Sequence, residues 1–532
     1  MKKRGQLPNA MTFTTIFRGC ARSPHAKTAV AEAVKVYMNM LTNTRVTTNI
    51  IHVNAVLEVC ARALDIESMM SVAETVDNKT LKPDSVTYAT LLNGLRAWLD
   101  AEAARLPHGQ KNGYTSEEHA QAVAKTLEQA KRIWQEVIQK WRNGSLILDE
   151  SLVFSMGRLL LLGNRAEVMS IFDLLEQTMR IPNLEKKDRK AGGNVQTVFE
   201  NTPVEANRNA PMYPGPSTKT LAIVISALQD TRRVHLTLTY WNLLTRTHDV
   251  VPDGNNWHSL LYVLRRGHSS SQVVNVLNEM PRETINVKTI RIALKTCLQD
   301  NVNPQVMQNA DAILDKMTAV LRSPDPESLR LYLDVATTSH HQYRLQKRRG
   351  VDSAPLDAAY AEQIVSALEN LFEPDVFPRC RDELLAILEA ARPRAADAKP
   401  GRGDRGRRPM SHDKALGREK EQRALARSYA SEVVAFLRKA VAAWDRVITE
   451  RLLPEDRLAP LRRKRGAVNG FVSSYFTILK EADAWSTEEG PAKGEEPVET
   501  EGPATEGKKK RSGLGVKVIE DLLEVTRNLD VK

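Results

Sequence analysis

A six-residue pattern recurs in the N-terminal part of the chain and each time opens an amphipathic stretch. Two copies begin at Asn49 and Asp84, 35 positions apart, and a third begins at Asn9, 40 positions before Asn49. Pro8 and Pro83 precede two of the three copies, and proline cannot continue a preceding helix. Self-similarity at this period is typical of stacked helical hairpins. Because one hairpin cannot bury its apolar face alone, neighbouring hairpins must stack, which leaves a long surface free for binding.

The repeated pattern divides the N-terminal part of the chain into four helical hairpins. Apolar residues recur at helical spacing in these segments, as in the stretch from Val53 to Ala63. A polar insertion at about 103–118 separates the two helices of the third hairpin, and we expect it to form a surface loop. The four predicted hairpins span residues 10–49, 50–84, 85–148 and 149–183.

The rest of the chain alternates between helical segments and segments of linker composition. Residues 184–217 contain Gly192, Gly193, several prolines and many charges, and residues 393–417 are basic and glycine-rich. Both have too little apolar content to pack, so we expect disordered inserts there. The remaining predicted segments are divergent helical repeats at 218–392, C-terminal helices at 418–486, a low-complexity acidic and basic segment at 487–514 and a terminal helix at 515–532.

Composition favours an all-α fold. Aromatic residues make up 5% of the 532 residues, and helical segments follow one another without an alternation of strands and helices. We therefore predict a solenoid of antiparallel helix hairpins. The formal net charge of +11 favours a polyanionic partner.

Several classes of site are not predicted. The four cysteines are scattered, at Cys20, Cys60, Cys297 and Cys380. Their spacing favours neither a disulfide framework nor a zinc site. No phosphate-binding loop or nucleophile elbow is found, and the adjacent His340 and His341 would diverge by about 100° on a helix, which suits one metal poorly. We expect no enzyme activity, no metal and no cofactor.

Neither a membrane helix nor a targeting segment is predicted. The longest apolar run, from Leu159 to Leu162, is far shorter than the roughly 18 residues that a membrane helix requires. The segment from Met1 to Gly5 leaves no room for a cleavable presequence before the first hairpin. Since a solenoid normally begins with a polar capping element, we expect that the chain has been processed or that its true start lies upstream.

Helical hairpins of 35 residues that open on a sequence such as Val86-Thr87-Tyr88 and close on Pro-Asp or Pro-Asn resemble the pentatricopeptide repeat family. The match is most specific over residues 10–100, and the layout is similar to fungal mitochondrial members concerned with the small ribosomal subunit. The resemblance implies a right-handed superhelical solenoid in the mitochondrial matrix that binds single-stranded RNA. It implies a role in RNA processing or stability, or in small-subunit assembly through ribosomal RNA, with mitochondrial ribosomal proteins as further partners.

In that family the fifth residue of each repeat, together with the residue that closes the repeat, selects one RNA base. The first repeat offers Thr14 with Asn49, which by the family's rule favours adenine. The second offers Asn54 with Asp84, which favours uracil. Hydroxyl and amide groups supply the donors and acceptors that a base edge needs. Ala89, in the third repeat, has no polar atom to offer and should discriminate poorly.

The second residue of each of the first three repeats is apolar. These residues are Met11, Ile51 and Val86. In the family, residues at this position wedge between successive bases, so the resemblance assigns them to RNA binding. The alternative is that they are ordinary packing residues at the start of a helix.

Other binding functions stay open alongside this interpretation. The same hairpins would suit a tetratricopeptide scaffold that binds peptides, although the Trp and Gly-x-x-Tyr spacing of that family is not found. The alternative function is therefore a protein-protein scaffold associated with the mitochondrial ribosome. The basic run from Arg394 to Arg408 is either an RNA-contacting tail that orders on binding or a solvated linker.

Overall fold

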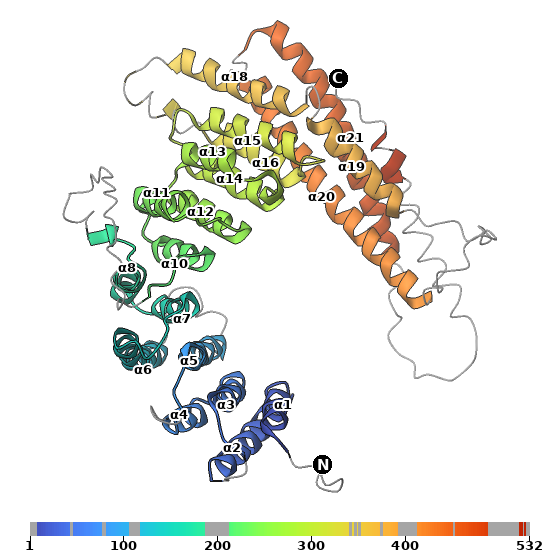
Figure 1. Ribbon diagram of the computed structural model, residues 1–532. Coiled ribbons are helices and arrows are strands. Elements are labelled where there is room, and N and C mark those ends of the chain that lie inside the picture. The colour runs from blue at the N-terminus through green and yellow to red at the C-terminus, as the bar shows by residue number, and fades with distance from the viewer. Residues whose placement is uncertain are drawn as a thin grey trace, which may run out of the picture. The chain divides into compact units, whose positions relative to one another are not determined.

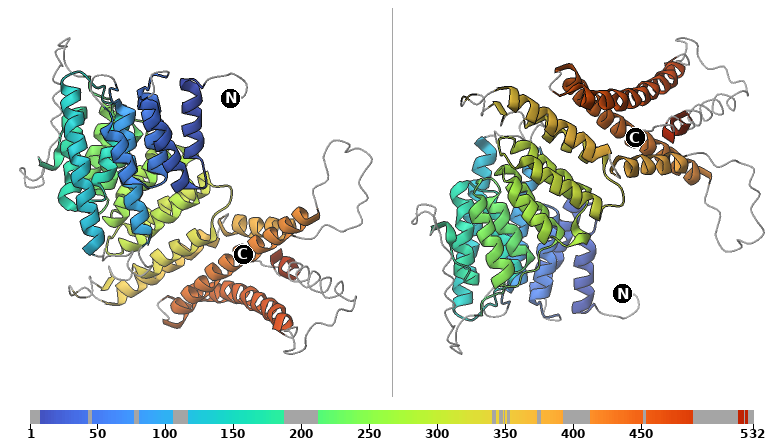
Figure 2. Two further views of the ribbon diagram at one scale, coloured as in Figure 1. Left: turned by 90° about the horizontal axis from the view of Figure 1, so that it is seen from below. Right: turned by 90° about the horizontal axis from the view of Figure 1, so that it is seen from above.

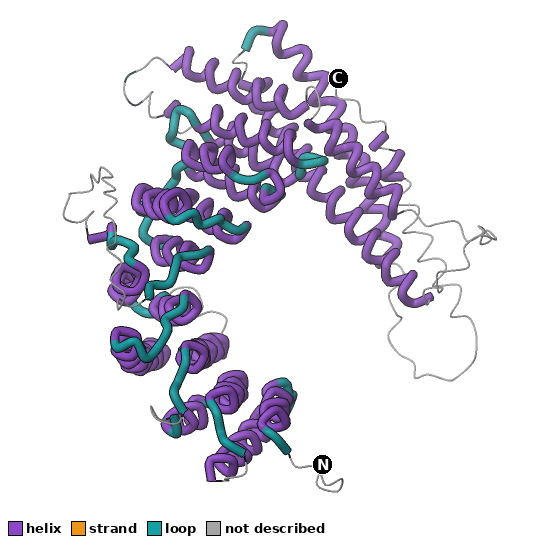
Figure 3. Tube along the Cα trace, viewed as in Figure 1, coloured by secondary structure: helices purple, strands orange, loops and turns teal. Residues whose placement is uncertain are grey.

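The computed structural model divides the chain into two compact units, unit 1 (residues 1–263) and unit 2 (residues 264–532). The residues that it describes are 8–42, 46–76, 81–105, 117–186, 212–339, 343–344, 348, 350, 353–372, 376–391, 412–450, 453–487, 521–524 and 526–527. Every regular element among them is a helix (Figure 3). None of these helices is both long and apolar enough to cross a membrane.

The described part of unit 1 is a stack of helix hairpins (Figure 1). Its first helices are α1 (Ala10–Ala21), α3 (Ile50–Arg62), α5 (Ser85–Arg105), α7 (Glu150–Leu160), α10 (Thr218–Leu228) and the start of α12 (Gly254–Arg266). Its second helices are α2 (Ala26–Thr42), α4 (Ile66–Glu74), α6 (Glu117–Arg142), α8 (Arg165–Met179) and α11 (Val234–Asn242), the last continued by the π-helix η3 (Leu243–Thr247). Consecutive first helices from α1 to α10 contact each other and form one layer (Figure 2).

Aliphatic side chains fill the space between the helices of unit 1. Val56 and Leu57 of α3 and Leu92 of α5 are fully buried where these helices pack. The Tyr37 side chain of α2 is also buried, and its Oη lies 2.6 Å from Oγ1 of Thr75 at the end of α4. The hydrophobic core therefore runs from one hairpin to the next, as stacking of individually unstable hairpins requires.

A glycine sets the distance between α7 and α10. A Cβ atom at Gly157 would lie 2.7 Å from Cδ1 of Ile223. Ile223 is 3% exposed, so this terminal methyl group has little space into which it could move. Glycine at position 157 thus permits a closer contact between the two first helices than any other residue would.

Unit 2 continues with helices that are longer towards the C-terminus. These are α13 (Ser270–Glu279), α14 (Val287–Gln299), α15 (Val306–Val320), α16 (Pro326–Thr338), α18 (Ser353–Phe372), α19 (Val376–Ala391), α20 (His412–Glu450) and α21 (Glu455–Thr487), with a 3-10 turn η4 (Arg282–Thr284) after α13. α14 contacts α16, and α16 contacts α20. Rings from three helices cluster in the core, where the Phe372 ring centroid of α18 lies 5.1 Å from that of Phe377 in α19 and 5.0 Å from that of Trp444 in α20.

The predicted all-α architecture of stacked antiparallel hairpins is confirmed within each unit. α20 begins at His412, six positions before the start that the sequence predicted at residue 418, so the helix enters the predicted basic linker. Of the predicted terminal helix, residues 521–524 and 526–527 are helical. Most of the predicted linkers at 184–217 and 393–417 and of the low-complexity segment, together with His340 and His341, lie outside the described residues.

Candidate nucleic-acid interface

Each first helix of unit 1 opens on a polar residue whose side chain accepts a hydrogen bond from the first turn. Asn49 accepts from the His52 backbone N–H at 3.1 Å, and Asp84 from that of Thr87 at 2.8 Å. Such caps satisfy the unpaired N–H groups of a helix start and stabilise it by roughly 0.5–2 kcal/mol each. We call these caps and the first turns that follow them the cap edge. Its caps are Asn9, Asn49, Asp84, Asp149, Ser217 and Asp253.

Hydrogen bonds join the first turns of neighbouring helices along the cap edge. The Glu150 carboxylate of α7 accepts bonds from the backbone N–H groups and the hydroxyls of Ser217 and Thr220, at the start of α10. The Asn256 amide, at the start of α12, donates to the carbonyl of Thr218 at 3.3 Å. These bonds place successive helix starts side by side, so the cap edge is a continuous surface of unit 1.

A buried histidine links the first two helix starts. His52 is fully buried, with Nε2 3.0 Å from the carbonyl oxygen of Ala10 and Nδ1 3.2 Å from the Asn49 backbone nitrogen. A carbonyl oxygen only accepts and a backbone N–H only donates, so Nε2 carries the proton and Nδ1 accepts. The neutral ring therefore satisfies both backbone groups and fixes α3 against α1.

The second-position residues are exposed on the cap edge. The side chains of Met11, Ile51 and Val86 are 75%, 54% and 54% exposed. Ile147 and Val251, each two residues before a cap, are 77% and 79% exposed. At least half of each of these residues is exposed, so packing against the protein engages only part of each side chain. A series of apolar side chains along one surface is typical of an interaction site.

The predicted pair Asn54 and Asp84 is in contact. Nδ2 of Asn54 donates to Oδ1 of Asp84 at 3.1 Å, across the gap between α3 and α5. The Thr87 hydroxyl lies 2.7 Å from Oδ1 of Asn54 and 2.8 Å from Oδ1 of Asp84. Oδ2 of Asp84 accepts no hydrogen bond from the described residues. One N–H of the Asn54 amide and this oxygen thus form an adjacent donor and acceptor, which suits the edge of a base.

The members of the other predicted pair, Thr14 and Asn49, each bond within their own helix. Thr14 is 8% exposed, and its hydroxyl donates to the carbonyl of Ala10 one turn earlier at 3.1 Å. The Asn49 side chain caps α3. No hydrogen bond joins Thr14 to Asn49 within the described chain. The third-repeat residue Ala89 is half-buried and apolar, as its identity requires.

An aromatic ring occupies the same place in α7 as Asn54 in α3, five residues after the cap. The Phe154 ring centroid lies 5.5 Å from the guanidinium carbon of Arg158 and 6.0 Å from the Lys219 ammonium. The Lys219 ammonium also donates to the hydroxyl of Ser151 at 2.8 Å. These residues are not among those predicted from the sequence, although Phe154 lies five positions after Asp149 in the fourth hairpin.

In unit 2 the corresponding pair is an ion pair. Arg291, five residues after the cap Asn286, makes two hydrogen bonds with the Asp325 carboxylate, at 2.6 and 2.7 Å. It also pairs with Glu327. The hydrogen bonds that the guanidinium donates to Asp325, opposed by partial burial, hold the pKa of Arg291 above its usual value. This pair therefore serves the packing of α14 against α16.

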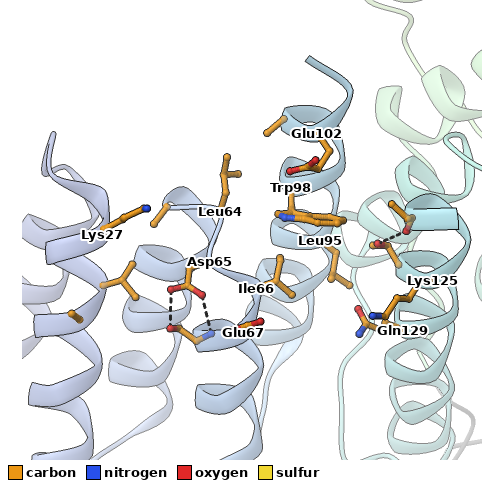
Figure 4. Close-up of a pocket in the computed structure, with 17 residues that line it drawn as sticks. Lys27, Leu64, Asp65, Ile66, Glu67, Leu95, Trp98, Glu102, Lys125 and Gln129 are labelled. Atoms are coloured by element: carbon orange, nitrogen blue, oxygen red, sulfur yellow. Dashed lines mark hydrogen bonds between the residues drawn. The ribbon is translucent and has the colours of Figure 1, made fainter. Parts of the chain in front are cut away.

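A cavity of about 930 Å³ lies in unit 1 at the end of the first helices opposite the cap edge. It forms above the start of α4, because α4 has 9 residues whereas α6 has 26. Figure 4 shows Lys27 and Lys125 on opposite sides of the cavity, with Trp98 between them. Asp65 also lines it, so its walls carry both signs of charge. Mixed charge of this kind does not favour a polyanion.

The cysteines of the structure are free thiols, and three of them are buried. Burial raises the pKa of Cys60 and of Cys297 to about 12, so both are protonated near neutral pH. Their role is in packing. Within the described residues no three His, Cys, Asp or Glu side chains are grouped so that they could hold a metal ion.

The comparison with protein families concerns the hairpins that carry Asn54 and Asp84. Residues 34–95 match the pentatricopeptide repeat domain. The matched stretch runs from α2 through α3 and α4 into α5 and includes the exposed residues Ile51 and Val86. No curated protein sequence matches the chain.

Solved structures of a pentatricopeptide repeat protein also resemble the chain. The structure of PPR10 in complex with an 18-nt psaJ RNA element is 13% identical, with a TM-score of 0.29, over 91% of this chain. The chain covers 66% of the length of that protein. The structure of PPR10 from maize is 13% identical with a TM-score of 0.24, over 99% of this chain and 76% of that one.

Proposed function

We propose that this chain is a pentatricopeptide repeat protein that binds single-stranded RNA along the cap edge of unit 1. The observation that carries the proposal is the contact between Asn54 and Asp84, flanked by the exposed side chains of Ile51 and Val86 and lying within the matched repeat sequence. The polar pair offers a donor and an acceptor to a base edge. The apolar side chains on either side would insert between successive bases, which are unstacked in single-stranded RNA.

The chemistry of the cap edge favours one strand over a duplex. In double-stranded RNA the base edges are paired and the bases are stacked on each other, so neither Asn54 nor Ile51 could reach its target. The net charge of +11 favours binding to the phosphates of either form. Selectivity for single strands would therefore arise at the cap edge, while part of the affinity would arise from charge alone.

The biological role that we propose follows from the resemblance to the family. It is mitochondrial RNA processing or stabilisation, or assembly of the small ribosomal subunit through its ribosomal RNA, with mitochondrial ribosomal proteins as further partners. Recognition of RNA, without chemistry on it, is the activity proposed. The alternative, a ribosome-associated protein scaffold, predicts that the chain binds ribosomal proteins and discriminates poorly between RNA and other polyanions.

Replacing Ile51 or Val86 by serine tests the proposal. Each substitution removes an apolar side chain from a residue that is 54% exposed, so the free energy of unfolding should change by less than about 0.5 kcal/mol. Affinity for random-sequence single-stranded RNA should fall several-fold, and more in the double variant. Fluorescence anisotropy of a labelled RNA pool measures this, with duplex RNA as the competitor.

Leu162→Ser provides the matched control. Leu162 is 36% exposed and lies in the turn after α7, away from the cap edge. The proposal predicts that this variant binds RNA as the unchanged chain does. Equal losses in Leu162→Ser and Ile51→Ser, or equal affinity of the unchanged chain for single-stranded and duplex RNA, would contradict it.

A further inference from the structure

Two cationic side chains from neighbouring first helices, Arg158 of α7 and Lys219 of α10, lie beside the Phe154 ring. Arg158 lies one turn further along α7, and Lys219 is the second residue of α10. Both cations lie within about 6 Å of the ring, the range of a cation–π contact. The ring is half-buried and the Lys219 side chain is exposed, so the group faces solvent on the cap edge.

The carboxylates near this group are already engaged. Glu150 accepts hydrogen bonds from Ser217 and Thr220, and Asp149 caps α7 through the backbone N–H of Leu152. Among the residues that the structure describes, no carboxylate forms an ion pair with Arg158 or Lys219. Within the described part of the chain, two positive charges beside one aromatic ring therefore have no carboxylate partner.

A purely structural cation–π pair elsewhere in unit 1 has a different arrangement. The Lys140 ammonium lies 5.4 Å from the Tyr88 ring centroid, and the Glu136 carboxylate neutralises it at 2.7 Å. The Tyr88 hydroxyl donates to Glu136 and accepts from Lys140, so Lys140, Tyr88 and Glu136 form a set of three mutually bonded side chains. The described residues around Phe154 include no negative member of such a set, and a ligand phosphate would supply it.

We infer that Phe154, Arg158 and Lys219 form a nucleotide site that accepts any base of a single-stranded RNA. The base stacks on the Phe154 ring, and the adjacent phosphate binds Lys219 and Arg158. The inference rests on the proposed function. Because every base has a π-face, stacking of this kind adds affinity without choosing a sequence. The fourth hairpin thus anchors the RNA, whereas the pair Asn54 and Asp84 selects a base.

The test compares Phe154→Leu and Phe154→Trp in the full chain, using labelled homopolymeric single-stranded RNAs of each base. Phe154→Leu keeps an apolar side chain of similar volume but removes the aromatic face. We expect it to weaken binding about 5- to 100-fold for every base, the effect measured for loss of one base–aromatic stack. Phe154→Trp retains an aromatic face and should bind at least as tightly as the unchanged chain.

Phe476→Leu is the matched control, since Phe476 is 37% exposed and also lies beside an arginine, Arg438, at 5.4 Å. It should leave RNA affinity unchanged. Lys219→Gln and Arg158→Gln should each make the slope of log affinity against log salt less steep by about 0.7, the contribution of one phosphate contact on a single strand.

Each outcome separates this inference from the proposed function. If the unchanged chain binds RNA and Phe154→Leu binds equally well, or loses affinity for one base only, the nucleotide site is refuted while RNA binding stands. If the unchanged chain binds no single-stranded RNA, the proposed function fails and the site fails with it. Retained affinity in Phe154→Trp together with a loss for every base in Phe154→Leu, at equal melting temperatures, supports the site, because the two variants differ in the aromatic face.

Discussion

At the scale of single residues, the same polar side chains serve both the fold and the candidate site. Asp84 caps α5 through the backbone N–H of Thr87 and also accepts a hydrogen bond from Asn54. Only one of its two carboxylate oxygens takes part in these bonds, so the second can face a ligand. Capping fixes the position of the carboxylate at no further cost in conformational entropy on binding.

Exchange of the polar pair tests its role in base selection. The double variant Asn54→Thr, Asp84→Asn gives the second repeat the side chains of the first, Thr14 and Asn49. Asparagine already caps α1 and α3, so the helix start should be retained. By the family's rule we expect the enriched base at one position of selected RNAs to change from uracil to adenine. Sequencing of RNAs selected from a random pool by each protein gives the result.

Retention of uracil at every position by the double variant would refute the assignment of Asn54 and Asp84 to base selection. Thr14→Ala serves as the control. Its hydroxyl bonds to Ala10 in a nearly buried place, so the structure predicts a weaker effect on selected sequences than the exchange at the second repeat.

At the scale of helices, what the sequence could predict depends on whether the signal is local. Asn9, Asn49 and Asp84 mark helix starts within one turn, and the structure begins α1, α3 and α5 directly after them. Helix caps and the spacing of apolar residues act over a few positions and can therefore be recognised in the sequence. The all-α hairpin architecture follows from the same local signals.

The convergence of Phe154 and Lys219 could not be predicted in this way. These residues are 65 positions apart, and they meet because α7 packs against α10. The burial of Thr14 likewise depends on how α1 packs, which the residue pattern does not specify. Contacts of this kind are set by tertiary packing, and only the position of Phe154 five residues after a cap was visible beforehand.

The packing of α7 against α10 predicts that Gly157→Ala destabilises the unchanged chain but not the Ile223→Val variant. Gly157→Ala places a methyl group where Cδ1 of Ile223 now lies, so we expect the overpacking cost of about 1–3 kcal/mol to exceed the gain in helix propensity of about 1 kcal/mol. In the Ile223→Val background the obstructing Cδ1 atom is absent. There Gly157→Ala should become neutral or stabilising.

Chemical denaturation of the four proteins of this double-mutant cycle measures both effects. A coupling energy near zero would show that α7 and α10 are not in close contact at Gly157. Gly19→Ala is a suitable control, because a Cβ atom there meets nothing within 4 Å. It should raise the free energy of unfolding by up to about 1 kcal/mol.

At the scale of the whole chain, each unit presents its caps differently. In unit 1 the cap edge carries exposed apolar side chains, the pair of Asn54 and Asp84, and two cationic side chains beside Phe154. In unit 2 the equivalent pair, Arg291 and Asp325, is bound internally together with Glu327. The proposed RNA-binding surface therefore belongs to unit 1, whereas the pair of Arg291 and Asp325 in unit 2 serves packing.

The most direct test of this account is to crosslink photoreactive single-stranded RNA to the full chain and identify the attached peptides by mass spectrometry. The account predicts attachment within the first turns of α3, α5 and α7, reduced by competition with unlabelled single strands and little by duplex RNA. Attachment confined to α18–α21, or none despite recovery of ribosomal proteins with the chain, would contradict RNA binding along the cap edge.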